Sequence, residues 1–132
     1  MRIFLDTNVL VSAVATRGLC ADVFREVLLE HQLIVSEVLI FEVETVLGEK
    51  LGLPPNVTAS FVELIRQDAI ISEAYELLSL EIRDESDLHI ISSAHHSGAE
   101  CFITGDKELL ELHQIGNMAI LSPRELWEKL TK

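Results

Sequence analysis

Acidic residues beside apolar stretches are the part of this sequence best able to do chemistry. Residues 3–5 form an apolar stretch that runs directly into Asp6, and residues 101–103 form another that reaches Asp106 after Thr104 and Gly105. Three further acids lie beside apolar segments that would draw them inward: Glu42, Asp84 and Asp87. Burying an ionised carboxylate is costly unless a cation meets it. Because several carboxylates forced together repel one another, a divalent cation is the simplest neutraliser.

The chemistry that such a set of acids favours is metal-dependent hydrolysis of a phosphodiester. Hard oxygen ligands select Mg²⁺ or Mn²⁺, and two such ions roughly 4 Å apart can activate a water and stabilise the departing oxygen. We expect Asp6 to bridge or anchor the metals, with Asp87 and Asp106 as further ligands. We expect Glu42 to bind metal through a water or to orient the attacking water.

The elements that must position these acids alternate along the chain. After the first strand, helices are expected over about 19–31, 37–50, 56–68, 85–97, 107–112 and 123–130, and strands or extended segments over 33–35, 69–71, 100–103 and 119–121. Residues 11–18 are expected to form a polar turn, and residues 73–80 are ambiguous. The alternation implies an α/β three-layer sandwich, with a central mainly parallel sheet and helices on both faces. Ligands of such folds bind beyond the C-terminal strand ends, where Asp6 and Asp106 are placed.

Each acid other than Asp6 also has an ordinary structural explanation. Glu42 lies on the shoulder of the buried stripe of its helix, where a glutamate is usually a solvated edge residue. Asp84 and Asp106 each stand where a helix N-cap is expected. Asp87 falls in the first turn of its helix, where backbone N–H groups and the helix dipole favour an anion. We therefore favour Asp87 over Asp84 as a site residue.

The histidines and cysteines are not expected to carry chemistry. His89, His95 and His96 lack companions at convincing ligand spacing, so a zinc site is not expected. Cys20 and Cys101 are far apart in the sequence and have apolar surroundings, which favours two reduced, buried thiols over a disulfide.

Length and composition indicate a single domain over residues 1–132. Hydrophobic residues make up 48% of the chain and aromatic residues only 5%, so the core must be mainly aliphatic. The apolar runs are too short and too often interrupted by charges to span a membrane. No export signal is found at the N-terminus, because Asp6 arrives almost at once. We expect a soluble, cytoplasmic protein.

The formal net charge of −12 argues against nucleic-acid binding, which depends on neutralising phosphates. A metal site weakens this objection, since bound cations supply the positive charge that a polyanion meets. A basic partner protein is the other natural consequence of the acidity. Arg17, expected near the Asp6 end of the first strand, could touch a phosphate or simply be a solvated loop residue.

The sequence resembles the PIN domain family, most closely its toxin-like bacterial and archaeal members of the VapC kind. The resemblance rests on four motifs that occur in order and at appropriate spacing, over residues 4–8, 41–47, 83–87 and 103–110. It implies a metal-dependent ribonuclease with Asp6, Glu42, Asp87 and Asp106 as the acidic site, with Thr7 or Asn8 and Thr104 as supporting polar groups, and with Asp84 as a candidate addition. The implied products carry a 5′-phosphate and a 3′-hydroxyl.

The same resemblance suggests partners. Many proteins of this kind are toxins that pair with an antitoxin and form dimers, so RNA, an antitoxin protein and a second copy of the chain are the candidate partners. The net charge of −12 motivates the hypothesis that a basic or arginine-bearing segment of an antitoxin enters the acidic site.

Three alternatives place acids in comparable positions. A phosphatase or phosphotransferase of the haloacid dehalogenase kind needs a second aspartate where Asn8 stands, and a late lysine for which Lys107 is a poor substitute. A phosphoacceptor receiver domain needs an aspartate at the end of a middle strand, and residues 33–35 do not end in one. The non-enzymatic alternative is a PIN-like domain that binds RNA or a protein without cleaving it.

Overall fold

A six-stranded sheet forms the centre of the protein in the computed structural model, which describes residues 1–131. Its strands lie in the order β3 (Ile70–Ser72), β2 (Gln32–Ser36), β1 (Arg2–Leu5), β4 (Cys101–Ile103), β6 (Met118–Leu121) and β5 (Gln114–Ile115). All neighbouring strands pair in parallel except β5 and β6, which are antiparallel. The predicted α/β fold with a mainly parallel sheet is therefore confirmed. Lys132, the last residue of the expected domain, lies outside the described residues.

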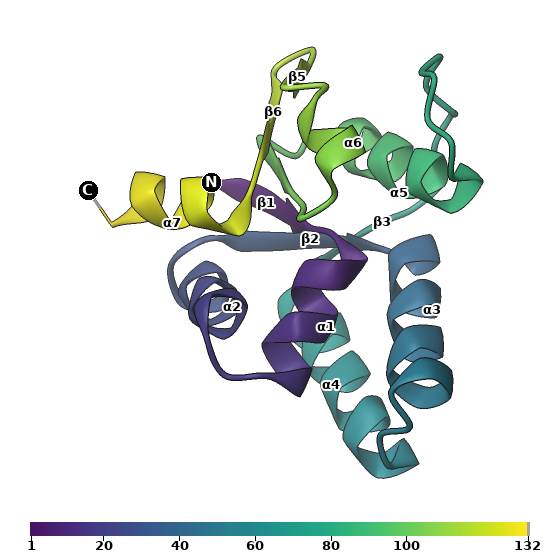
Figure 1. Ribbon diagram of the computed structural model, residues 1–132, viewed down its shortest axis with the longest axis vertical. Coiled ribbons are helices and arrows are strands. Elements are labelled where there is room, and N and C mark those ends of the chain that lie inside the picture. Colours follow the sequence, from purple (N-terminus) through teal and green to yellow (C-terminus); the bar gives the residue numbers. More distant parts are fainter. Residues whose placement is uncertain (132) are drawn as a thin grey trace.

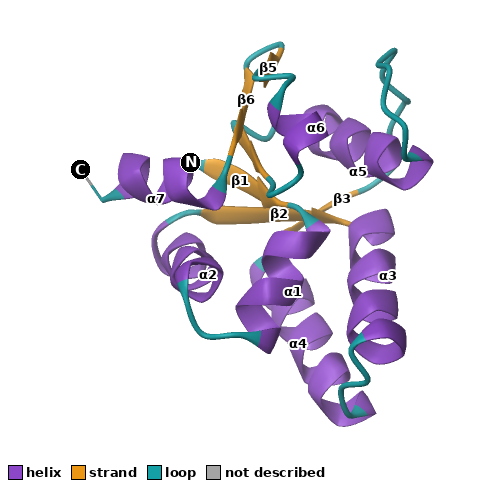
Figure 2. Cartoon of the chain, in the orientation of Figure 1, coloured by secondary structure: helices purple, strands orange, loops and turns teal. Residues whose placement is uncertain are grey.

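Helices cover both faces of this sheet. They are α1 (Thr7–Ala15), α2 (Leu19–Glu30), α3 (Glu37–Thr45), α4 (Pro55–Asp68), α5 (Glu85–His96), α6 (Lys107–Leu110) and α7 (Pro123–Leu130). Figure 1 shows α1, α2 and α4 on one side of the strands and α5 and α6 on the other, while α7 packs near α2. Figure 2 shows the strands as the middle layer between these helices. No helix within residues 1–131 is long and apolar enough to cross a membrane.

The core is centred on β1 and its neighbours, because both faces of these strands are covered. Phe4 and Phe102 occupy paired positions on β1 and β4, and their rings stack with centroids 5.5 Å apart. Both are fully buried. The remaining core is almost entirely aliphatic, as the aromatic content predicts. Cys20 and Cys101 are free thiols, as expected, although Cys20 is only half-buried.

The first helix, α1, was not expected from the sequence. Residues 11–18 were expected to be a polar turn, yet the helix begins at Thr7, because the carboxylate of Asp6 accepts a hydrogen bond from the Thr7 backbone N–H and caps it. Arg17 follows the C-terminal end of this nine-residue helix, roughly 14 Å along the axis from Asp6. The expectation that Arg17 lies near the Asp6 end of the strand is therefore wrong.

Three other local features complete the comparison with the expected elements. Helix α3 continues into a π-helical turn, η1 (Val46–Lys50), so the expected helix over 37–50 changes its hydrogen bonding partway. The short strand β5 was not expected. Residues 73–80, whose structure the sequence leaves ambiguous, are irregular, and no helix or strand lies between Ser72 and Glu85. It is held to α5 by the Leu78 backbone N–H, which donates to Ser92 Oγ at 2.9 Å.

Candidate active site

The acids meet beyond the C-terminal ends of β1 and β4. The chain leaves β1 toward β2 on one side and later returns to β4 on the other, so the strand order reverses between β1 and β4. Parallel α/β folds bind their ligands beyond the C-terminal strand ends at such a position. The backbone N–H of Asp6 donates to the carbonyl oxygen of Ile103 at 2.8 Å, which extends the pairing of β1 and β4 by one step. Asp6 therefore lies beside the loop that leads from β4 to Asp106.

Asp6 is buried, with only 4% of its surface exposed. One carboxylate oxygen, Oδ1, accepts from the Thr7 backbone N–H and the other, Oδ2, from the Thr104 hydroxyl, each at 2.8 Å. Burial raises the pKa of Asp6 from 3.8 to about 6, although the two hydrogen bonds lower it, and the negative charges of Glu42 and Asp106 raise it further. The site thus holds an acid whose ionised form is fixed in orientation, and no lysine or arginine in the part of the chain that the structure describes is ion-paired with it.

Thr104 connects the two strand-end acids. Its side chain is fully buried, and its hydroxyl donates to Asp6 Oδ2 while accepting from the backbone N–H of Asp106 at 3.0 Å. Asp106 itself caps α6, since its Oδ1 accepts from the backbone N–H of Glu108 at 2.8 Å. A single hydroxyl therefore sets the position of one acid relative to the other.

The other two acids of this sheet end, Asp84 and Asp87, stand at the start of α5. Asp84 is exposed and caps the helix, with its Oδ1 accepting from the backbone N–H groups of Ser86 at 2.8 Å and Asp87 at 3.3 Å. Asp87 is half-buried, and its pKa rises from 3.8 to about 7, mainly through burial. Four neighbouring carboxylates raise this pKa further, in the order Asp6, Asp84, Asp106 and Glu42. Asp87 is therefore close enough to the other four acids for their charges to raise its pKa, whereas the Asp84 carboxylate is engaged by its own helix.

Glu42 reaches the same region from α3, the helix that directly follows β2. It is half-buried and adds to the negative potential felt by Asp6 and Asp87. A hydrogen bond of 2.9 Å between the hydroxyls of Ser93 and Ser36 ties α5 to the start of α3. Both serines are buried, and Ser36 also caps α3. This contact, which sequence reasoning missed, fixes the helix of Glu42 relative to the helix of Asp87.

The two polar residues after Asp6 differ in their surroundings. Thr7 is buried, and its hydroxyl is one of two buried side-chain polar atoms in residues 1–131 that have no hydrogen-bond partner. Asn8 is exposed, and its Oδ1 accepts a long hydrogen bond of 3.4 Å from the Gly105 backbone N–H. Asn8 thus supports the loop between β4 and Asp106, while the Thr7 hydroxyl is free to bind a water or ligand.

The donor set of this site fits a hard divalent cation held partly through water. Within residues 1–131, no three His, Cys, Asp or Glu side chains lie close enough together to hold a metal ion directly. Across the same residues, none of the five acids is ion-paired with a lysine or arginine. Mg²⁺ keeps several waters and binds through only one or two carboxylates, so it suits oxygen ligands spaced more widely than a closed cage.

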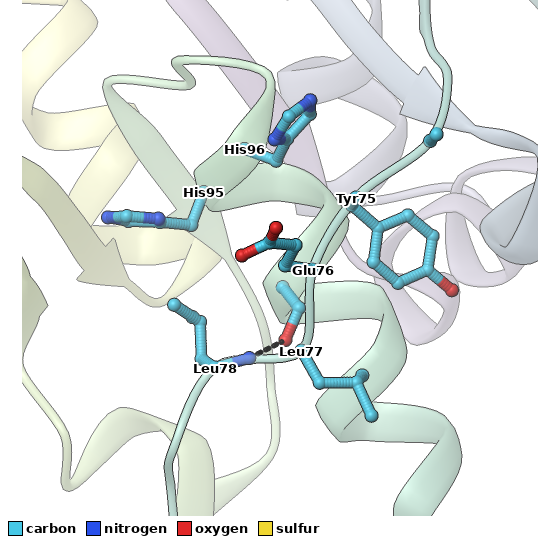
Figure 3. A pocket seen from close by; sticks show the side chains of 8 residues that line it. Tyr75, Glu76, Leu77, Leu78, His95 and His96 are labelled. Atoms are coloured by element: carbon cyan, nitrogen blue, oxygen red, sulfur yellow. Dashed lines mark hydrogen bonds between the residues drawn. The ribbon is translucent and has the colours of Figure 1, made fainter.

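A separate cavity of about 610 Å³ lies between residues 74–78 and the C-terminal half of α5 (Figure 3). Its lining includes Glu76, His95 and His96, and none of the five acids. Figure 3 shows the two histidine rings pointing in different directions. This cavity is therefore distinct from the acidic site.

Comparisons with known proteins agree with this architecture. Residues 2–108 match the family model described as PIN domain. A search of curated protein sequences gave no match. Among solved structures, the chain is similar to a chain in the crystal structure of VapBC2 from Rickettsia felis, in which VapBC2 is bound to a DNA fragment from its own promoter. That match has a TM-score of 0.66 at 16% identity and covers 92% of this chain and 98% of the other, so it shows a shared fold. Because the family model spans most of its length, the chain belongs to the PIN domain family.

Proposed function

We propose that this protein is an endoribonuclease that uses Mg²⁺ or Mn²⁺ to hydrolyse RNA phosphodiester bonds. The observation that carries the proposal is that five carboxylates lie near one another with no ion-paired lysine or arginine among residues 1–131, and that two of them have raised pKa values. Such an arrangement is unfavourable for stability, and acids with strongly perturbed pKa values cluster at functional sites. The PIN domain family is typically composed of metal-dependent nucleases, which supports the same conclusion.

The proposed roles follow from how each acid is held. Asp6 anchors the metal, because two hydrogen bonds fix its orientation while each oxygen keeps a lone pair available. Asp87 and Asp106 are the further ligands, at least one of them through a bound water, because no three acids within residues 1–131 lie close enough to hold one ion directly. Glu42 binds through a water or orients the attacking water. When bound, one or two divalent ions would neutralise these acids, polarise the phosphoryl oxygens and make a water a stronger nucleophile. The Thr104 hydroxyl fixes the position of Asp6 relative to Asp106, because it contacts both residues.

We also propose that the protein is the toxin component of a toxin–antitoxin system. A solved structure that shares its fold is a VapBC toxin–antitoxin complex. The net charge of −12 supports a partner with a basic segment. A homodimer and a cytoplasmic location, both expected from the sequence, stay predictions.

The test is Mn²⁺-dependent cleavage of a mixed pool of structured and single-stranded RNAs. Wild type is compared with Asp6→Asn and Asp106→Asn, and each variant is first shown to be folded by circular dichroism. We expect only the wild type to cut, leaving 5′-phosphate ends, and chelation by EDTA to stop it. Equal cleavage by all three proteins would identify a contaminant and contradict the proposed roles. If the wild type binds RNA without cleaving it, the alternative of a non-enzymatic PIN-like domain would be favoured.

A further inference from the structure

Arg83 lies between the two helices that carry the candidate site acids. It directly precedes Asp84, the cap of α5, and it contacts Glu108 of α6, the helix capped by Asp106. The Arg83 backbone N–H donates to Glu108 Oε1 at 3.3 Å, and its guanidinium Nε lies 3.7 Å from Glu108 Oε2. A cation is thus held at the border of the acidic site without being ion-paired with any acid of that site.

The guanidinium of Arg83 is not built into the protein surface. Its side chain is 94% exposed, and its one charged contact is long. By contrast, Arg66 donates two hydrogen bonds of 2.8 Å to the carboxylate of Glu37, and its side chain is 42% exposed. An exposed pair such as Arg83 with Glu108 contributes little to the stability of a fold. The fork of N–H donors on Arg83 is therefore available to a ligand, and its geometry matches a phosphate or a carboxylate.

A cavity of about 390 Å³ opens at this border. It is lined by Glu81, Ile82, Arg83 and Glu108, and none of the five site acids lines it. It is therefore a neighbouring space rather than part of the acidic site, and its size falls within the range of roughly 300–1,000 Å³ that is usual for ligand pockets.

A polyanionic substrate needs such a contact here more than in most nucleases. The chain has only 10 lysines and arginines against 22 acids, and the acidic site repels RNA wherever metal charge does not reach. We propose that Arg83 binds an RNA phosphate next to the scissile one, in the cavity beside α6. Glu108 contacts the guanidinium in the absence of RNA, and the phosphate takes the place of the Glu108 carboxylate when RNA binds. This inference rests on the proposed function, because it assigns a substrate-binding residue to the same reaction.

The experiment measures binding of a fluorescently labelled single-stranded RNA of about 12 nucleotides, by anisotropy with Mn²⁺ present. The RNA has a cleavage-resistant backbone, so that binding is read independently of cleavage while Asp6 and the proposed metal site stay intact. Arg83→Gln and Glu108→Gln are compared with Arg25→Gln and Asp22→Asn. The second pair is a matched control, because Arg25 and Asp22 form an exposed pair on α2 that is also 3.7 Å apart. Each control changes the net charge by the same amount as its counterpart.

We expect Arg83→Gln to weaken binding about tenfold and to reduce the slope of log Kd against log salt by about 0.7, the value for one phosphate contact on a single strand. Glu108→Gln should tighten binding about threefold by freeing the guanidinium, and most of this gain should vanish when Arg83 is also Gln. The control pair should change Kd by less than about twofold.

The outcomes separate this inference from the proposed function. If Arg83→Gln binds RNA as its parent does, or if Arg25→Gln weakens binding equally, the inference is overturned while the nuclease proposal stands. If the parent protein does not bind RNA measurably, the inference is overturned as well. If Arg83 controls binding but the wild type cuts no RNA, the contact is supported and the nuclease proposal fails.

Discussion

Replacing Asp6 by asparagine should stabilise the fold at neutral pH when no divalent cation is present. In the folded state the Asp6 pKa is about 6 instead of 3.8, so folding favours the protonated acid. Well below pH 3.8 Asp6 is protonated in both the folded and the unfolded state, so it does not lower the free energy of unfolding. As pH rises from 3.8 through about 6, the unfolded chain ionises first, and stability is lost.

The size of this effect follows from the shift. A rise from 3.8 to about 6 corresponds to a loss of about 3 kcal/mol above both values, at about 1.4 kcal/mol per pKa unit. Asparagine avoids this cost, but its amide replaces one of the two acceptor oxygens that bind the Thr7 N–H and the Thr104 hydroxyl. Losing one such hydrogen bond costs about 1 kcal/mol. The net stabilisation should be about 2 kcal/mol, which raises Tm by roughly 8 °C in a chain of this length.

The assay is denaturant unfolding of wild type and Asp6→Asn in EDTA, repeated from below pH 3.8 to about pH 7.5. We expect the variant to be the more stable protein at neutral pH and to lose that advantage at the acidic end. Adding Mn²⁺ should stabilise the wild type and leave the variant nearly unchanged, because the metal binds only the intact site. A variant that is less stable than the wild type at neutral pH in EDTA would refute the reasoning.

Three further predictions concern the supports of the site, its proton balance and the core. Thr104→Val removes the hydroxyl that contacts Asp6 and the Asp106 backbone, so it should lower the rate of RNA cleavage by about 10- to 100-fold at the same Mn²⁺ concentration. Thr104→Ser keeps the hydroxyl and should keep most of the activity. Loss of activity in both variants would indicate that Thr104 acts through packing instead. Mn²⁺ affinity, measured by calorimetry, should increase as pH rises through about 7, because binding must displace the proton that Asp87 retains, and a flat profile would contradict this. Phe102→Ala should cost about 3–5 kcal/mol in denaturant unfolding, since the ring is fully buried against Phe4, whereas Leu77→Ala, at a side chain 50% exposed, should cost far less; similar losses would show that the stack is not central.

Local patterns in the sequence were enough to place most elements and the candidate acids. Asp6 and Asp106 each follow a short apolar strand, and parallel strands bring their C-terminal ends to one edge of a sheet. The helix caps at Ser36 and Ser122 were also predictable, because serine followed by a helical pattern is a strong start signal.

Other features depend on contacts between distant segments, which local patterns do not encode. The order of the strands, which makes β1 and β4 neighbours, determines that Asp6 lies beside Thr104. The bond between Ser36 and Ser93 joins residues 57 positions apart. Helix α1 was missed for a different reason, since Asp6 both ends a strand and caps a helix, and only the first role was considered. That error also placed Arg17 too close to the site.

The most direct measurement of the central claim is the position of Mn²⁺ in crystals of the wild type soaked with that ion, from its anomalous scattering. We expect a peak within direct or water-mediated reach of Asp6, Asp87 and Asp106, and no such peak in Asp6→Asn crystals treated alike. Manganese bound only elsewhere in the wild type, for example beside His95 and His96, would contradict the assignment of these acids as the metal site.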